Sequence, residues 1–372
     1  MLLSLTNVPR DYAWGSPALI AELEGRAPTG APEAEVWFGD HPSDPADVAD
    51  GTTLDAVTGG SLPYLLKILA AAAPLSIQVH PTIAQARDGR AREAGLAEDD
   101  PQRNYRDENH KPELIVALSD RFEALAGLRP VADTLRLLDA LGDGDAVRAL
   151  RARLTADGDA LGDTIAWLLA GEGRAEIEGI RVALAAASAP ELDETLAALR
   201  TVAERNPGDP GIGVAVLMNH IVLRRGEGIF LRAGLLHAYL SGLGVEIMAA
   251  SDNVLRGGLT PKHVDVPELL SIVDPAPAVV PVLRPAGEGG VVSYPVDVPD
   301  FALRRVSLAG EPVTVPVSGP AMVLATGGEV AVTGADAASL AVPPGTAAFA
   351  TADETTLTLT GEGEAFIAQP GT

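Results

Sequence analysis

Short apolar runs separated by turn residues fill the first third of the chain. The runs AEVWFG, LPYLLKIL, LSIQVH and PELIVAL are rich in β-branched and aromatic residues, a composition that favours β-strands. Turn signals such as EGRAPTGAP and DGTT lie between them. We therefore expect residues 1–125 to be mainly β-structure.

Residues 126–207 change to helical spacing. In PVADTLRLLDAL, apolar side chains recur every three or four residues, at Val131, Leu135 and Leu138. The segments DTIAWLLAG and ELDETLAALRTVAERN follow the same spacing, and glycine-rich breaks such as LGDGD and AGEG separate them. The pattern predicts an inserted domain of several short helices, with Trp167 in its core and no chemical motif of its own.

The rest of the chain returns to β-like patterns. Residues 208–270 continue the first β region, and we expect residues 271–372 to form a separate β domain. In that last region FALRRVSL, AMVLATGGEVAVT, TAAFAT and TLTLTGEGEAFIAQ are separated by turns at the spacing of a sandwich or barrel. It contains no His, Lys or Cys, which excludes a histidine-based metal site there and favours a structural or interface role.

Composition narrows the class of protein. With 372 residues the chain can bury a large core, and none of its apolar stretches reaches the roughly 18 residues of a membrane span. The start, MLLSLTNVPRDYAWG, lacks the basic region of a signal peptide, so we expect a cytoplasmic protein. A net charge of −24 argues against nucleic acid or an anionic membrane as partner, but charge screened over roughly 8 Å does not exclude a small anion.

The chain has no cysteine, which excludes disulfides and thiolate metal sites. A bound metal must therefore use imidazole or oxygen ligands. In LSIQVHP, Gln78 and His80 lie two residues apart, and Pro81 favours extended backbone at His80. On a strand such residues share a face, so they form either half of a metal site or a hydrogen-bonded pair in the core.

Two further segments offer groups of the same kind. In DENHKPELIVAL, Lys111 precedes a proline, so Lys111 and Glu113 are expected to share the face of a strand; a surface turn is the alternative. GEGIFLRAGLLHAYLSG fits the second cupin motif, G-x5-P-x-G-x2-H, ending at His237 and with Arg232 in place of the proline. In cupins that histidine points into a small β-barrel and binds metal, although a lone histidine on an apolar strand is more often a core residue.

The stretch GVEIMAASDNVLRGGLTPKH is polar and glycine-rich. Its cations Arg256 and Lys262 suit an anion such as a phosphate, because a guanidinium binds a phosphate through two parallel hydrogen bonds. A solvated loop would carry the same residues without function. Taken together, the segments supply a set of nitrogen and oxygen ligands for one divalent metal: Gln78, His80, Glu113 and His237. Such a set suits zinc without demanding it, and an open coordination position would let it bind a substrate oxygen.

In its ordered motifs the chain resembles the type I phosphomannose isomerase family of the cupin superfamily. The matching segments, in order, are YAWGS, AEVWFGDHPS, LPYLLKIL, LSIQVHP, ENHKPELIVAL, NPGDPG, GEGIFLRAGLLHAYLSG and ASDNVLRGGLTPKHVD. They extend over most of residues 1–270, whereas the last hundred residues share only a β-rich character. The resemblance implies a mainly β fold with a helical insertion: a cupin-type β-barrel or jelly-roll catalytic domain of residues 1–125 and 208–270, the helical domain 126–207, and a second cupin-like domain, 271–372.

The resemblance also implies roles for individual residues. It makes Gln78, His80, Glu113 and His237 the ligands of one Zn²⁺ per chain. It places Arg256 at the active site, implicates His110 and Lys111 in proton transfer or substrate positioning, and assigns pocket positions to Ser76, Glu246, Asp252 and Lys262. Of these, Glu246 and Asp252 are further candidates for the base, and Ser76, Arg256 and Lys262 for binding the substrate or its phosphate.

The implied reaction interconverts mannose 6-phosphate and fructose 6-phosphate through a cis-enediol(ate), in a monomer without nucleic-acid or membrane partners. It needs a base and an electrophile for the developing oxyanion. Two other classes of protein stay open. His80, Glu113 and His237 are also the ligand set of iron oxygenases, which would leave Gln78 unexplained. A cupin that binds metal or sugar phosphate without turnover would leave the clustered acidic and basic groups unexplained.

Overall fold

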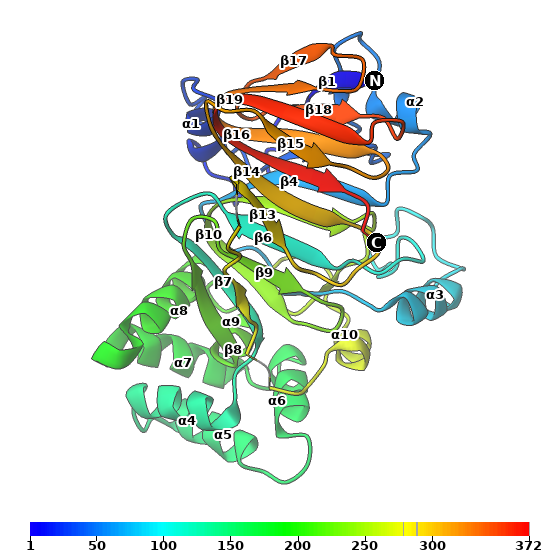
Figure 1. Cartoon of the computed structure of the whole chain (residues 1–372). Helices are drawn as coiled ribbons and strands as arrows, with labels where there is room; N and C mark the ends of the chain where they lie inside the picture. The colour runs from blue at the N-terminus through cyan, green and yellow to red at the C-terminus, as the bar shows by residue number, and fades with distance from the viewer. Residues whose placement is uncertain (278, 288, 372) are drawn as a thin grey trace.

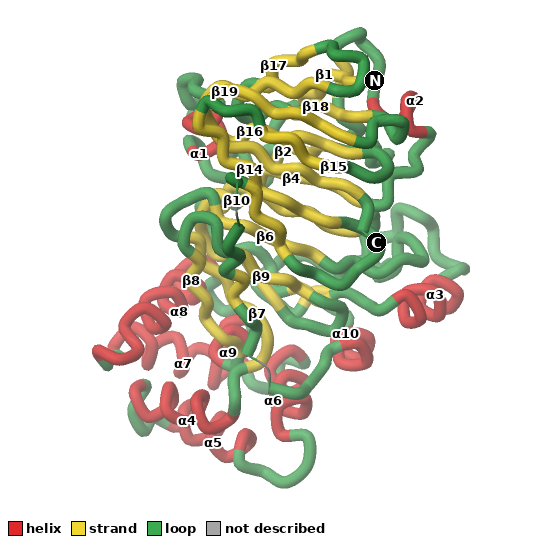
Figure 2. The backbone as a smooth tube through the Cα atoms, viewed as in Figure 1, coloured by secondary structure: helices red, strands yellow, loops and turns green. Residues whose placement is uncertain are grey.

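The computed structural model describes residues 1–277, 279–287 and 289–371. Strands predominate, and most of the helices gather at one end of the molecule (Figures 1 and 2). The helices are α1 (Leu19–Leu23), α2 (Leu54–Thr58), α3 (Ile83–Arg92), α4 (Val131–Ala140), α5 (Asp145–Leu154), α6 (Ala160–Leu169), α7 (Arg174–Ala186), α8 (Asp193–Arg205), α9 (Gly211–Val216) and α10 (Val266–Ile272), with a 3-10 turn, η1, at Pro190–Leu192.

The strands of the first β region are β1 (Leu2–Thr6), β2 (Glu35–Phe38), β3 (Asp47–Val48), β4 (Tyr64–Ala71), β5 (Gln78–Val79), β6 (Glu113–Ala117), β7 (Phe122–Leu128), β8 (Met218–Leu223), β9 (Gly228–Leu231), β10 (His237–Ala249) and β11 (Leu255–Arg256). The later strands are β12 (Val282–Leu283), β13 (Val291–Tyr294), β14 (Ala302–Ala309), β15 (Val313–Pro316), β16 (Ala321–Thr333), β17 (Ser339–Val342), β18 (Ala347–Ala350) and β19 (Thr356–Gln369).

One antiparallel sheet has the strand order β13-β14-β19-β16-β18-β1-β3, with β15 paired to β19 and β17 to β16. Most of its strands come from the last hundred residues, as the four alternating runs predicted. Strand β1 pairs with β18, however, so the first strand of the chain joins the sheet built mostly by the last part (Figure 1). Both chain ends therefore belong to this sheet.

The second antiparallel sheet is built around β10, which pairs with β4, β5, β6 and β7. The path β11-β5-β10-β6-β9-β12 is open, because the two outer strands are not paired with each other. The described strands therefore form two antiparallel sheets and no closed barrel, so the expected cupin-type barrel or jelly roll is confirmed only as a mainly β fold with a helical insertion. One physical reason is length: β5, β11 and β12 have two residues each, too few to continue a ladder around a barrel.

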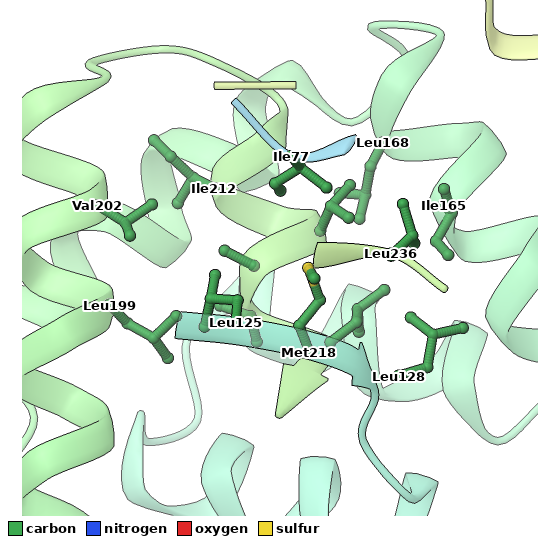
Figure 3. Packing of buried hydrophobic residues seen from close by; sticks show 14 of the residues in the cluster. Ile77, Leu125, Leu128, Ile165, Leu168, Leu199, Val202, Ile212, Met218 and Leu236 are labelled. Atoms are coloured by element: carbon green, nitrogen blue, oxygen red, sulfur yellow. The ribbon is translucent and has the colours of Figure 1, made fainter. Parts of the chain in front are cut away.

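Helices α4 to α9 share one hydrophobic core with strands β5, β7, β8 and β10 of the second sheet (Figures 1 and 3). Ile77 and Leu125 from the strand region contact the core formed with Leu168 and Leu199 from the helices, and Trp167 is buried there, as predicted. The helical spacing thus identified the face that packs on the sheet. In the described residues no helix is both long and apolar enough to cross a membrane.

A separate core lies between the two sheets. It includes Phe38 and Leu66 from the second sheet and Phe349 and Phe366 from the first. The hydroxyl of Tyr64 donates to the carbonyls of Pro320 (3.0 Å) and Ala368 (3.3 Å), which ties β4 to the opposite sheet. The opposite faces of β4 and β6 pack against β7 and β8 in a third core, which includes Ile115, Phe122 and Ile221, so β4 and β6 are buried on both faces.

Candidate metal centre and active site

Strands β4, β6 and β10 are buried on both faces, and their side chains alternate between two surroundings. Leu66 and Val245 pack in the core between the sheets. The residues beside them, Lys67 and Glu246, point to the opposite face, where Glu113 of β6 joins them in one small cavity. All three charged side chains are buried, which is costly unless they are paired or bind a cation. The alternation therefore concentrates charge at one place.

Three of the predicted metal ligands meet there. His80, Glu113 and His237 are buried, and they offer ligand atoms that all lie within 4.8 Å of one another. The two Nε2 atoms approach different carboxylate oxygens of Glu113, His80 at 3.3 Å and His237 at 3.2 Å. Two imidazoles and a carboxylate at these spacings form a suitable half-shell for one divalent metal.

The main chain fixes the orientation of both imidazoles. His80 Nδ1 lies 2.7 Å from the carbonyl oxygen of Asn253, and His237 Nδ1 lies 3.0 Å from that of Leu235. A carbonyl can only accept, so each Nδ1 carries the proton and each Nε2 keeps its lone pair. His80 Nε2 is buried without an aligned hydrogen-bond partner among the described residues, despite its short distance to Glu113. An orphaned, inward-facing nitrogen of this kind fits a metal ligand.

The electrostatics favour the protonation states that a metal needs. Burial lowers the pKa of His80 to about 4, so its ring is neutral near pH 7. Burial alone would raise the pKa of Glu113, but the charge of Lys111 and the neighbouring imidazoles outweigh it and hold that pKa well below its usual range. The Lys111 ammonium lies 3.0 Å from Glu113 Oε1. Lys111 and Glu113 thus share a face, as predicted.

Gln78 lies between His237 and Arg256 on three neighbouring strands. In the ladders, Gln78 of β5 is paired with His237 of β10 on one side and with Arg256 of β11 on the other. Directly opposed residues of antiparallel strands point to the same face. The row therefore brings Gln78 to the edge of the histidine–glutamate cluster, with Arg256 one strand further out. Gln78 Nε2 also donates to Ser76 Oγ (3.3 Å).

A cavity of about 50 Å³, here called the inner cavity, adjoins the cluster. Its polar lining residues are Glu35, Lys67, Ser76, Gln78, Lys111, Glu113, His237, Tyr239 and Glu246. Lys67 Nζ lies 3.4 Å from Glu246 and 3.8 Å from Glu35. Burial opposes the charge of Lys67, but these carboxylates raise its pKa overall; burial and the charge of Glu113 raise the pKa of Glu246. Tyr239 donates to Glu246 at 2.8 Å.

A second cavity of about 500 Å³, here called the outer cavity, is rich in cations. Its lining residues are Pro101, Arg103, Asn104, Arg106, Asp252, Val254, Arg256, Pro261, Lys262 and His263. Burial and the nearby charge of Arg106 lower the pKa of Arg256, and burial and the charge of Arg256 lower that of Lys262. These cations therefore repel one another, and an anion bound between them would relieve the repulsion.

Comparison with known proteins agrees with this geometry. Residues 2–131 match the family model described as phosphomannose isomerase type I, catalytic domain. Over 383 aligned positions the chain is 36% identical to mannose-6-phosphate isomerase of Salmonella typhimurium, covering 96% of this chain and 97% of that protein. The chain belongs to the type I phosphomannose isomerase family.

Other members of the family extend the comparison. The human mannose-6-phosphate isomerase is 30% identical, with 82% of each chain covered. A crystal structure of a mannose 6-phosphate isomerase bound with zinc and yttrium superposes with a TM-score of 0.89 at 33% identity, and a variant of the Salmonella typhimurium phosphomannose isomerase with a TM-score of 0.90 at 33% identity; both comparisons cover all of both chains. Curated relatives from bacteria to mammals carry the name of an enzyme, and this chain is an enzyme of their family.

The candidate residues for proton transfer lie at different distances from the two cavities. Asp252 lines the outer cavity, and a contact of 3.0 Å to His41 lowers its pKa. His110 is not among the described residues that line either cavity; its Nε2 lies 2.8 Å from Asp300. Of the four candidates for proton transfer, Lys111 and Glu246 reach the inner cavity.

Sequence reasoning missed seven polar residues that line the two cavities. Lys67, Glu35 and Tyr239 line the inner cavity, and Arg103, Asn104, Arg106 and His263 line the outer one. One signal was available: Lys67 is one of three lysines in the chain and interrupts an apolar strand, where a charge needs a buried partner. Nothing in the sequence around Arg106 distinguishes it from a surface arginine.

We expect His80→Ala to weaken zinc binding by more than about 100-fold, because losing a ligand costs more than the ~10–100-fold typical of residues behind the ligands. The measurement is zinc titration against a chromophoric chelator. His220→Ala is the matched control, since it removes another largely buried imidazole, at Glu123 rather than at Glu113. Equal zinc affinity in His80→Ala and the wild type would show that His80 is not a ligand.

Proposed function

We propose that this enzyme interconverts mannose 6-phosphate and fructose 6-phosphate through a cis-enediol(ate). The observation that carries the proposal is the adjacency of two features: the buried cluster of His80, Glu113 and His237, and the cationic outer cavity at Arg256 and Lys262. A metal held by the cluster would bind the sugar oxygens, and the cations of the outer cavity suit a phosphate. The names of the relatives, mannose-6-phosphate isomerase, supply the substrate.

We propose Gln78, His80, Glu113 and His237 as ligands of one Zn²⁺ per chain. The donor set supports zinc, because it combines two neutral imidazoles, one carboxylate and one amide without sulfur. Bound there, zinc would act as a Lewis acid on the sugar's carbonyl and hydroxyl oxygens. One carboxylate and a neutral amide leave a formal positive charge at the centre, which favours that chemistry. The zinc-bound relative supports the choice of metal.

The outer cavity is the proposed phosphate site. Arg256 and Lys262 supply charge and hydrogen-bond donors there, and Arg256 is paired in the strand ladder with Gln78, which lines the inner cavity. Ser76 contacts Gln78 in the inner cavity and would bind a sugar hydroxyl. This arrangement would hold the sugar with its phosphate outward and its first two carbons toward the cluster, and Arg256 would stabilise negative charge developing between them.

Proton transfer needs a base beside the first two carbons. Glu246 and Lys111 line the inner cavity, and the raised pKa of Glu246 moves it toward the range of a general base. Asp252 would act from the outer cavity, where its lowered pKa makes it a weaker base. His110 would need to turn away from Asp300 to reach a substrate, so we propose a positioning role for it.

The domain division stays part of this proposal: 1–125 with 208–270 as a cupin-type catalytic domain, 126–207 as the helical domain and 271–372 as a cupin-like domain, of which residues 278, 288 and 372 lie outside the described part. Helices α4 to α8 support the helical domain. The pairing of β1 with β18 adds the first residues to the last domain's sheet. A monomer in the cytoplasm, without nucleic-acid or membrane partners, remains a prediction from the sequence.

Chelation should abolish isomerisation of mannose 6-phosphate, and added Zn²⁺ should restore it, because the buried cluster lacks another strong electrophile. Formation of fructose 6-phosphate, followed by a coupled assay, is the measurement. Turnover that survives complete removal of metal would contradict the metal dependence. Absence of turnover in the zinc-loaded protein would contradict the reaction itself.

Lys262→Ala should raise KM for mannose 6-phosphate by about 10- to 100-fold with little change in kcat, since one hydrogen bond to a charged group is worth about 1.5–3 kcal/mol. Arg256→Ala should raise KM and also lower kcat. Steady-state kinetics of both variants test the assignment, with Arg284→Ala as a control at an exposed cation paired to Glu227. An unchanged KM in Lys262→Ala would remove Lys262 from the phosphate site.

A further inference from the structure

Asn253 is a fully buried polar side chain between two parts of the site. It lies in the turn between β10 and β11, and none of its surface is exposed. A primary amide has two N–H donors and an oxygen with two lone pairs, and leaving any of them unpaired in the interior is costly. The partners of Asn253 therefore show what the side chain does.

Those partners all belong to one short segment, residues 106–109. The side-chain oxygen accepts from the backbone N–H groups of Arg106 (2.7 Å) and Asp107 (3.2 Å). The side-chain nitrogen donates to the backbone carbonyls of Asp107 (3.0 Å) and Asn109 (2.8 Å) and to the Asp107 carboxylate (3.1 Å). One amide thus replaces the strand partner that this segment lacks in the described structure.

Residues 106–109 and Asn253 connect to both the metal cluster and the outer cavity. Arg106 lines the outer cavity, and the chain continues from Asn109 to Lys111, which contacts Glu113. On its other side, the backbone carbonyl of Asn253 accepts from His80 Nδ1 at 2.7 Å. A shift of Asn253 would therefore move an imidazole of the metal cluster and a guanidinium of the cationic cavity together.

We propose that Asn253 is a positioning residue that couples the metal centre to the phosphate-binding cavity. The inference rests on the proposed function and adds to it a residue that holds both subsites in register. It also explains why an asparagine is needed. Aspartate would lose the two N–H donors and place a second carboxylate against Asp107, which already accepts from Ser251 Oγ (2.9 Å) and from the Asp252 N–H (2.7 Å).

The test measures two binding constants that do not require turnover. Zinc affinity is measured by competition with a chromophoric chelator, and inorganic phosphate affinity by calorimetry on the zinc-loaded protein. Asn253→Asp, which keeps the size of the side chain, and Asn253→Ala should each weaken both constants by about 10- to 100-fold, the range for groups that orient metal ligands. If either constant keeps its wild-type value in both variants, the coupling role is wrong.

Two controls separate coupling from a general loss of stability. Arg106→Gln should weaken phosphate binding and leave zinc affinity unchanged, because its backbone N–H still reaches Asn253. Asn206→Ala removes a side-chain hydrogen bond to the Val202 carbonyl at the end of α8 and should change neither constant. If Asn206→Ala moves both constants as far as Asn253→Asp does, the effect reports stability and the proposal fails.

Hydrogen exchange in the wild-type protein tests the same contacts without a substitution. The backbone N–H groups of Arg106 and Asp107 should exchange slowly, because both donate to the buried Asn253 oxygen. Exchange of both at the rate of free amides would overturn the proposal, even if neither Asn253 variant folds. Failure of the isomerase assignment would appear differently, as absent turnover with intact zinc and phosphate binding.

Discussion

Burial of the Glu113 carboxylate is the constraint around which the second sheet, the one built around β10, is organised. An ionised carboxylate in an apolar interior is unstable unless cations or hydrogen-bond donors surround it. Here it faces Lys111 and two imidazoles whose opposite nitrogens are bound to main-chain carbonyls. Lys67, Glu35 and Glu246 form a second buried group of charges beside it. A dication bound by His80, Glu113 and His237 would complete the charge balance of this interior and would account for the ionisable groups that lie among apolar strands.

The register of the strands places these charged side chains on one face of the second sheet. On β4, β6 and β10 the alternate residues fill the core between the sheets, so a shift of one residue would turn Lys67, Glu113 and Glu246 into that core. The long strand β10 pairs with β5 and β7 along its first half and with β4 and β6 along its second half. Its register against β7 shifts between Tyr239 and Ser241, next to Gly242 at φ 119°. A left-handed backbone conformation there favours glycine. Along this strand His237 lies opposite Gln78, and Glu246 lies opposite Lys67.

Local pattern was enough to predict a part of the site. The two-residue spacing of Gln78 and His80, and of Lys111 and Glu113, placed each pair on one face because both segments are extended and flanked by proline. Ile77 and Val79 do pack on the helical core, opposite to His80. The strand itself is only Gln78–Val79, shorter than the apolar run suggested. His237 and the loop at Arg256 needed family motifs, since a lone histidine on an apolar strand has no distinguishing spacing.

Other features depend on pairings between distant residues and could not be predicted locally. Whether the second sheet closes depends on which short edge strands pair, and β1 pairs with a strand more than three hundred residues away. The contact of His110 with Asp300 spans 190 residues. In the helical region the spacing identified α4, α6 and α8, but α5 and α7 were not singled out, because their arginines and glutamates mask the apolar stripe. Lys67 was missed for a similar reason: its partners lie on other strands.

The most direct test of the account is a crystal structure of the zinc-loaded protein with anomalous diffraction at the zinc edge. We expect one zinc peak per chain, about 2.0–2.2 Å from His80 Nε2, His237 Nε2 and a Glu113 oxygen, with the Gln78 side-chain oxygen completing the shell. Both Nδ1 atoms should keep their main-chain carbonyl partners. Zinc bound through either Nδ1, or away from Glu113, would contradict the central claim that the main chain aims these two imidazoles at a single metal.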